Sequence, residues 1–153
     1  MRILRFLTIA LVAAGAAACD NTSIPEGVAG SYTLSVVGTE DPPVWANWNG
    51  AQGGGHQLMS ARLTLRDNGA LEAAFRYRDV GSEGAGAEQT LTLTGTWTEQ
   101  GDRVTLQMAS AGVFALEPEL VVASNRRIEA LVGLQLPAYV GYGWVPMPAT
   151  FTR

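Results

Sequence analysis

Apolar and polar residues alternate with a repeat of two along much of the chain. The clearest case is the segment QTLTLTGTWT, where Leu91, Leu93, Gly95 and Trp97 would share one face and threonines the other. The same alternation runs through 31–36, 59–66, 71–78 and 103–108. One apolar and one polar face is typical of half-buried antiparallel strands, not of helices. The pattern therefore predicts an all-β protein.

Three further segments complete the predicted set of strands. The segments 128–134 and 146–152 are typical of regular strands, whereas 109–123 is irregular. Pro118 in the irregular segment indicates an edge or a bulge, because proline cannot donate a ladder hydrogen bond. The total is eight strands, and closing them into a barrel buries the apolar face and removes both edges. We predict a single eight-stranded antiparallel up-and-down barrel over residues 30–153.

The connections between the predicted strands alternate in length. Short turns are predicted at Asp67-Asn68-Gly69, Glu99-Gln100-Gly101-Asp102 and Ser124-Asn125-Arg126-Arg127, and long connections at 39–56, 80–88 and 135–146. Successive connections of an up-and-down barrel emerge at opposite ends. The short turns and both termini would therefore lie at a closed end, and the long connections would surround an open mouth.

The N-terminus has the features of an export signal. Arg2 and Arg5 precede an uncharged segment, 6–18, that is too short to cross a bilayer. Ala16-Ala17-Ala18-Cys19 then resembles a bacterial lipobox, which implies lipidation of Cys19, the only cysteine in the chain. The alternative is an ordinary signal peptidase site followed by a free thiol. We expect a signal peptide over 1–18 and a lipidated tether over 19–29. The protein would then be exported and anchored to a bacterial membrane, on its periplasmic or cell-surface face.

Three short motifs add a resemblance to a known fold family. They are Gly30-Ser31-Tyr32 at the first strand, Gly95-Thr96-Trp97-Thr98 before a Gly-Asp turn, and Phe151-Thr152-Arg153 at the end. Together they resemble lipocalin-like (calycin-type) barrels, in which a tryptophan of the first strand lies against a basic residue of the last. The resemblance implies that Tyr32 takes the place of that tryptophan and that Arg153 supplies the cation.

The charge balance and the missing residue types argue against several classes of function. The chain has ten basic residues, all arginine, against fourteen acidic ones, and such a balance argues against nucleic acid as a partner. Without lysine, Schiff-base chemistry is excluded. His56, the only histidine, has no cysteine or carboxylate at metal-ligand spacing. No nucleophile motif or catalytic triad order is recognisable. We therefore expect a protein that is not an enzyme and has no metal or cofactor.

Aromatic residues gather in two of the predicted mouth segments and on the inward face below them. The candidate ligand-binding residues are Trp45, Trp48, Phe75, Tyr77, Tyr139, Tyr142 and Trp144. In one interpretation the mouth aromatics fold over and plug the barrel. In the other they form a rim for a ligand or partner. An eight-stranded barrel either fills with side chains or holds one small ligand. The expected function is binding of a small apolar ligand such as a lipid or fatty acid, and the alternative is a filled structural or protein-interaction module of the cell envelope.

Overall fold

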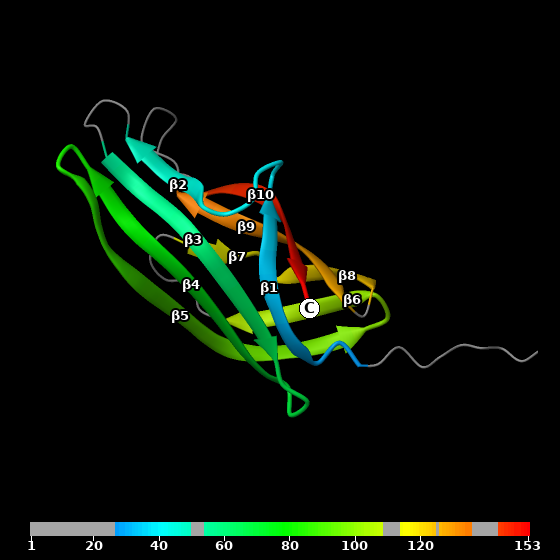
Figure 1. Cartoon of the computed structure of the whole chain (residues 1–153). Helices are drawn as coiled ribbons and strands as arrows, with labels where there is room; N and C mark the ends of the chain where they lie inside the picture. The colour runs from blue at the N-terminus through cyan, green and yellow to red at the C-terminus, as the bar shows by residue number, and fades with distance from the viewer. Residues whose placement is uncertain (1–26, 50–53, 109–113, 125, 136–143) are drawn as a thin grey trace, which may run out of the picture.

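The alternating sequence folds into antiparallel strands throughout the part of the chain that a computed structural model describes, residues 27–49, 54–108, 114–124, 126–135 and 144–153 (Figure 1). The strands are β1 (Gly30–Val37), β2 (Val44–Asn49), β3 (Gly54–Leu65), β4 (Ala70–Gly81), β5 (Gly84–Gln100), β6 (Arg103–Met108), β7 (Phe114–Leu116), β8 (Glu119–Ser124), β9 (Arg127–Gln135) and β10 (Trp144–Thr152). Among these residues no helix is long and apolar enough to cross a membrane. The all-β prediction is confirmed.

Eight of the strands close into a ring. Its order is β1, β10, β9, β8, β6, β5, β4 and β3, and β3 then pairs with β1. β1 closes the ring because it pairs with β10 along one edge and with β3 along the other. Thr33 is opposite Thr152 of β10, and Gly30 is opposite Leu65 of β3. The predicted eight-stranded antiparallel barrel is confirmed, and its form is compatible with a lipocalin-like fold.

The expected long connection over 39–56 is wrong in part, because it contains β2. β1 pairs only with the last residues of β3, and β2 takes up the same edge further along, with Val44 opposite Leu58. Val37 and Glu40 exchange backbone hydrogen bonds of 2.9 and 3.1 Å in the turn that separates β1 from β2. The part of the β3 edge that β1 leaves unpaired thus provides backbone partners for β2.

The described part of the irregular segment 109–123 forms two strands where one was expected. β7 and β8 both pair with β9, and Pro118 lies between them. Because proline has no N–H group, it interrupts the ladder at this point. Its carbonyl oxygen still accepts a 2.7 Å hydrogen bond from the amide of Leu106 in β6. The predicted interruption at Pro118 is therefore confirmed, with a division into two strands as its consequence.

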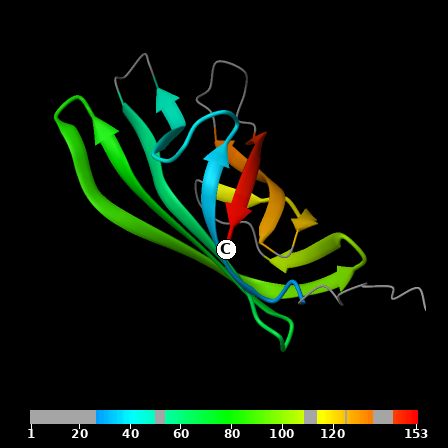
Figure 2. The same cartoon turned by 45° about the vertical axis from the view of Figure 1, so that its right-hand side comes forward.

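The expected long connection over 80–88 is also wrong, because β4 and β5 form a ladder almost to their tip. Gly81 pairs with Gly84, and Arg78 pairs with Glu88. Glycine and alanine, abundant in this part of β5, have low strand propensity, so the alternation gives no signal there. Figure 2 shows the β4–β5 hairpin reaching past the rest of the barrel on one side.

The predicted placement of the three short turns and the termini at one end is confirmed for the described residues. The β3–β4, β5–β6 and β8–β9 turns lie at one end, which we call the closed end, together with both described termini (Figures 1 and 2). Hydrogen bonds of 2.9 Å join these parts, from the Trp97 amide to the Gly69 carbonyl and from the Arg153 amide to the Arg126 carbonyl. The opposite end, where β2 and β9 finish and the β4–β5 tip lies, is called the open end.

The inward faces of the strands form an apolar core. The described residues include no buried polar or charged side chain. The largest fully buried side chains are Tyr32, Phe75, Phe114, Phe151, Leu58, Leu63, Leu65, Leu120, Ile128, Val104 and Val132. The small residues Ala61, Ala73 and Ala130 are buried in the same core. Bulky rings therefore occupy much of the interior.

Candidate functional site

Two of the predicted ligand-binding residues, Phe75 and Tyr77, lie next to one another on the inner face of β4. Phe75 is fully buried and stacks on Phe114 of β7, with ring centroids 5.3 Å apart and planes 5° from parallel. Tyr77 lies closer to the open end, is only partly buried, and meets Phe114 edge to face at 5.3 Å. The three rings form an aromatic floor beneath the open end, in which Phe75 is covered and Tyr77 is accessible.

The other predicted residues are described less fully. Trp45 lies in β2 beside the inward-facing Val44, so it occupies the outer face, and it is 42% exposed. It borders a small groove with Val37 and Met147. The structure places the backbones of Trp48 and Trp144 in strands near the open end, opposite Gly55 and Gln135. Cys19, Tyr139 and Tyr142 lie outside the described residues.

A polar cluster that the sequence did not predict adjoins the aromatic floor and shares Tyr77 with it. We call it the open-end cluster, and it consists of His56, Tyr77, Asp79 and Gln89. The Asp79 carboxylate accepts hydrogen bonds on both oxygens, at 2.7 Å from Nδ1 of His56 and at 2.8 Å from Nε2 of Gln89. The Tyr77 hydroxyl donates to Oε1 of Gln89 at 3.2 Å. The imidazole of His56 also contacts the Tyr77 ring edge to face at 5.9 Å.

The strand register assembles this cluster. His56 of β3 is opposite Asp79 of β4, and Tyr77 of β4 is opposite Gln89 of β5. Tyr77 and Asp79 are two residues apart and so share the inner face with Phe75. A bulge at Met59 moves the β3–β4 register by one residue, from Ser60 opposite Arg76 to Leu58 opposite Tyr77. Without that shift His56 would have Val80 as its opposite residue, so the sequence alone gave no reason to pair it with Asp79.

The cluster presents oriented polar atoms to the open end. Because Nδ1 of His56 bonds to Asp79, the Nε2 atom remains to meet a ligand, and the side chains of His56 and Asp79 are 27% and 55% exposed. The side-chain amide of Gln89 donates a hydrogen bond to Asp79 and accepts one from the Tyr77 hydroxyl. These two bonds orient the side chains of Asp79 and Tyr77. The described residues contain no group of three or more His, Cys, Asp or Glu side chains that could hold a metal ion. This arrangement suits recognition of a polar group attached to an apolar body.

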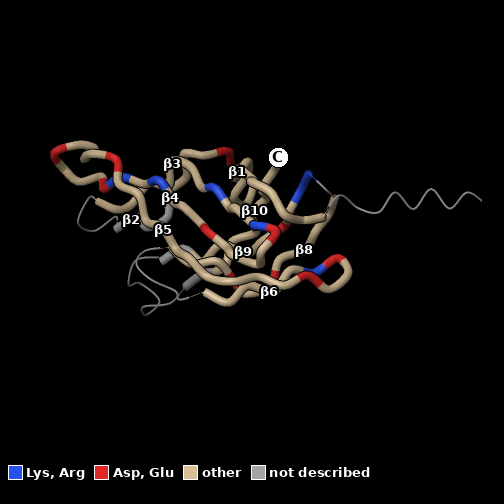
Figure 3. Tube along the Cα trace, turned by 90° about the horizontal axis from the view of Figure 1, so that it is seen from below, with Lys and Arg blue, Asp and Glu red and all other residues tan. Residues whose placement is uncertain are grey.

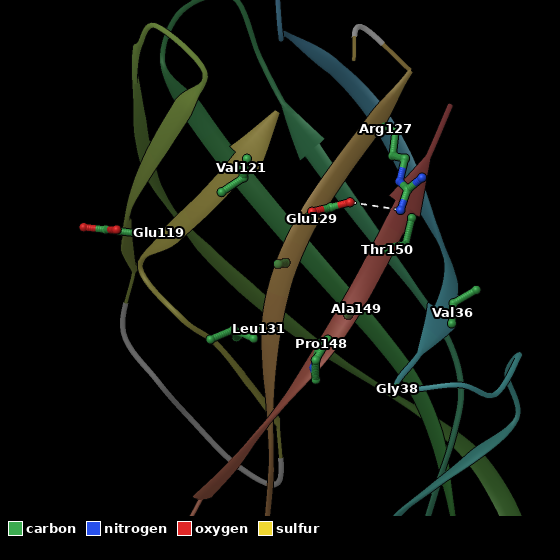
Figure 4. Close-up of a pocket in the computed structure, with 11 residues that line it drawn as sticks. Val36, Gly38, Glu119, Val121, Arg127, Glu129, Leu131, Pro148, Ala149 and Thr150 are labelled. Carbon is green, nitrogen blue, oxygen red and sulfur yellow. Dashed lines mark hydrogen bonds and ion pairs between the residues drawn. The ribbon is translucent and has the colours of Figure 1, made fainter. Parts of the chain in front are cut away.

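A second concave surface lies on the outer face of β1, β8, β9 and β10 (Figure 4). We call it the outer groove. It has a volume of about 510 Å³, and its apolar wall includes Val36, Val121, Leu131 and Pro148. Val121 and Leu131 are 43% and 41% exposed. Single outward apolar residues on separate strands leave no local pattern in the sequence, so this surface could not be predicted from it.

The closed end contains the ring–cation contact that the lipocalin-like resemblance implies. The guanidinium carbon of Arg153 is 5.1 Å from the centroid of the buried Tyr32 ring. Arg153 also donates a hydrogen bond to the Ala29 carbonyl, and a Cβ atom at Gly30 would overlap its guanidinium group. The Tyr32 hydroxyl donates a 2.6 Å hydrogen bond to the Val28 carbonyl. Burial raises the pKa of Tyr32 above its ordinary value, and the nearby Arg153 charge partly opposes this effect.

Comparison with protein-family models, with curated proteins and with solved structures gave no match.

Proposed function

We propose that the protein is a non-catalytic, lipid-anchored binding protein of a bacterial cell envelope, and that its open end receives a small ligand with an apolar body and a polar head. The observation that carries the proposal is that the polar groups of His56, Asp79 and Gln89 lie next to the partly accessible Tyr77 ring. Ligand sites of this kind combine apolar and aromatic walls with a few oriented polar groups. Here Tyr77 and the partly buried Leu91 supply apolar surface, and His56 and Asp79 supply exposed polar atoms.

The position of the N-terminus supports the anchoring part of this proposal. The first described residue, Gly27, lies at the closed end and accepts a 3.5 Å hydrogen bond from Arg153. A tether that begins at a lipidated Cys19 would therefore join the barrel at its closed end. Several acyl chains, at about 0.8 kcal/mol per buried CH₂, would hold such a domain on a membrane. The open end would then face away from the membrane.

Native mass spectrometry of the protein purified from its own membranes tests the ligand-binding part. We expect a small amphiphile to co-purify with the protein, and Tyr77→Ala to lose it, because the mutation removes the accessible ring of the floor. Leu131→Ala is the matched control, since it removes a comparable apolar side chain from the outer groove. Repeated absence of any bound molecule, or equal loss in both variants, would contradict the proposal.

The outer groove favours a second candidate function, contact with another envelope protein. Two of the exposed large apolar residues, Val121 and Leu131, line this groove, and exposed apolar surface of this kind often marks an interface. In this alternative the barrel is a filled scaffold. Leu131→Glu should then abolish a complex that Tyr77→Ala leaves intact, measured as the size of the protein in gentle membrane extracts.

A further inference from the structure

The charges near the open end are separated between the two faces of the β3–β5 sheet. In the open-end half of β3, β4 and β5, Asp79 is the formally charged side chain on the inner face of the described residues. The arginines of the same half, Arg76 and Arg78, lie on the outer face. Arg76 pairs with Glu88, and Arg78 donates to Oε1 of Gln57 at 2.7 and 2.9 Å. Figure 3 shows such basic and acidic positions distributed along the strands.

Asp79 is therefore a carboxylate that is held in place with no arginine of the described residues beside it. Its hydrogen-bond partners are an imidazole and an amide, which orient the two oxygens but leave the negative charge in place when the imidazole is neutral. The side chain is 55% exposed, so a ligand group can reach it. A carboxylate ligand would be repelled by Asp79, whereas a protonated amine would gain a charge-assisted hydrogen bond.

The rings next to Asp79 favour the same kind of ligand. Tyr77 is accessible, lies two residues from Asp79 on one face, and is braced by Phe114. The faces of aromatic rings attract cations, and this attraction adds to that of a nearby carboxylate. From this geometry we infer that the open end prefers amphiphiles whose head is a protonated amine and whose tail is apolar. This inference rests on the proposed function, since it names the class of ligand for the same site.

Three ligands with the same number of carbon atoms but different head groups distinguish a failure of the inference from a failure of the proposed function. Decylamine, decanol and decanoate, each below its micelle-forming concentration, are titrated calorimetrically into the full chain carrying Cys19→Ser. We expect decylamine to bind about three- to ten-fold more tightly than decanol, because an exposed ion pair and a contact with an aromatic ring each contribute modestly. Decanoate should bind most weakly. The preference should shrink at high salt.

Variants of Asp79 test whether this carboxylate causes the preference for decylamine. Asp79→Asn should reduce the affinity for decylamine to that for decanol, and Asp79→Lys should reverse the order in favour of decanoate. Glu88→Gln is the matched control, because it removes a carboxylate from the outer face of the adjacent strand, and it should leave the order unchanged. Circular dichroism verifies that each variant keeps its strands.

The outcomes are distinct. Equal affinities for decylamine and decanol, or an amine preference that survives in Asp79→Asn, would overturn the inference and leave the proposed function standing. If none of the three compounds binds, the proposed function fails and the inference fails with it.

Discussion

The guanidinium group of Arg153, the last residue of the chain, lies over the ring of Tyr32 in the first strand of the barrel. This contact joins β1 to the residue after β10 at the closed end, where Arg153 also bonds to the backbone of Ala29. A cation over an aromatic face contributes about 0.5–2 kcal/mol, more when the pair is shielded from water. The contact thereby holds the first and last strands of the barrel together at the closed end.

Removing the cation should weaken the closed end. We expect Arg153→Ala to lower the free energy of unfolding by about 1–2 kcal/mol, since the ring contact and the backbone hydrogen bonds are lost together. Urea unfolding followed by tryptophan fluorescence measures this. Arg62→Ala, an outward arginine of the adjacent β3, serves as the control. An Arg153→Ala protein as stable as the control would show that the contact adds nothing to stability.

Tyr32 should make the free energy of unfolding depend on pH in the alkaline range. Burial raises the pKa of Tyr32 in the folded protein above its ordinary value of 10.0, so the unfolded chain releases this proton at lower pH than the folded protein. The resulting contribution to stability is fully present below about pH 10 and is lost as pH rises through the folded-state pKa. Urea unfolding at pH 9 to 11.5 should show wild type losing stability relative to Tyr32→Phe. Parallel curves for the two proteins would contradict this cause.

Phe75 and Tyr77 should differ sharply in their effects on stability, although both are aromatic residues of one strand face. Phe75→Ala empties a fully buried site that is stacked on Phe114, and such changes cost about 3–5 kcal/mol. Tyr77→Ala should cost less, because its ring is only partly buried. Thermal or urea unfolding of the two variants measures the difference. A smaller cost for Phe75→Ala than for Tyr77→Ala would mean that the interior is not packed around Phe75.

Cys19 should determine where the protein is found. If acyl chains on Cys19 form the anchor, Cys19→Ser should move the protein from the membrane fraction to the soluble fraction of the envelope. Fractionation of cells that express the two forms measures this. Asp20→Asn is a control that leaves the thiol in place. A Cys19→Ser protein that still sediments with membranes would contradict the anchoring account.

The barrel was predictable because its strands carry a local signal. In β5, Leu91 and Leu93 alternate with threonines, and the turns after β3 and β5 contain Gly69 and Gly101, whose φ angles are 79° and 66°. Such glycines are favoured where the backbone turns through positive φ. Alternation and turn residues together were enough to define the strand count of the ring and its two ends.

The open-end cluster was not predictable, because it depends on register over a distance. His56 and Asp79 meet only because the bulge at Met59 shifts the pairing by one residue, and no residue type marks that bulge in the sequence. β2 escaped prediction for a related reason, since it exists because β1 leaves part of the β3 edge unpaired. Features that depend on neighbouring strands appear only once the sheet is assembled.

The central claim is that the ligand occupies the inner face of the open end, and amide chemical shifts test it most directly. Isotope-labelled Cys19→Ser protein is titrated with decanol, whose uncharged head makes the result independent of any preference for amines. The account predicts that the largest, saturable shifts fall on His56, Tyr77, Gln89 and Leu91. Shifts concentrated instead on Val121 and Leu131 would place the ligand in the outer groove and contradict the account.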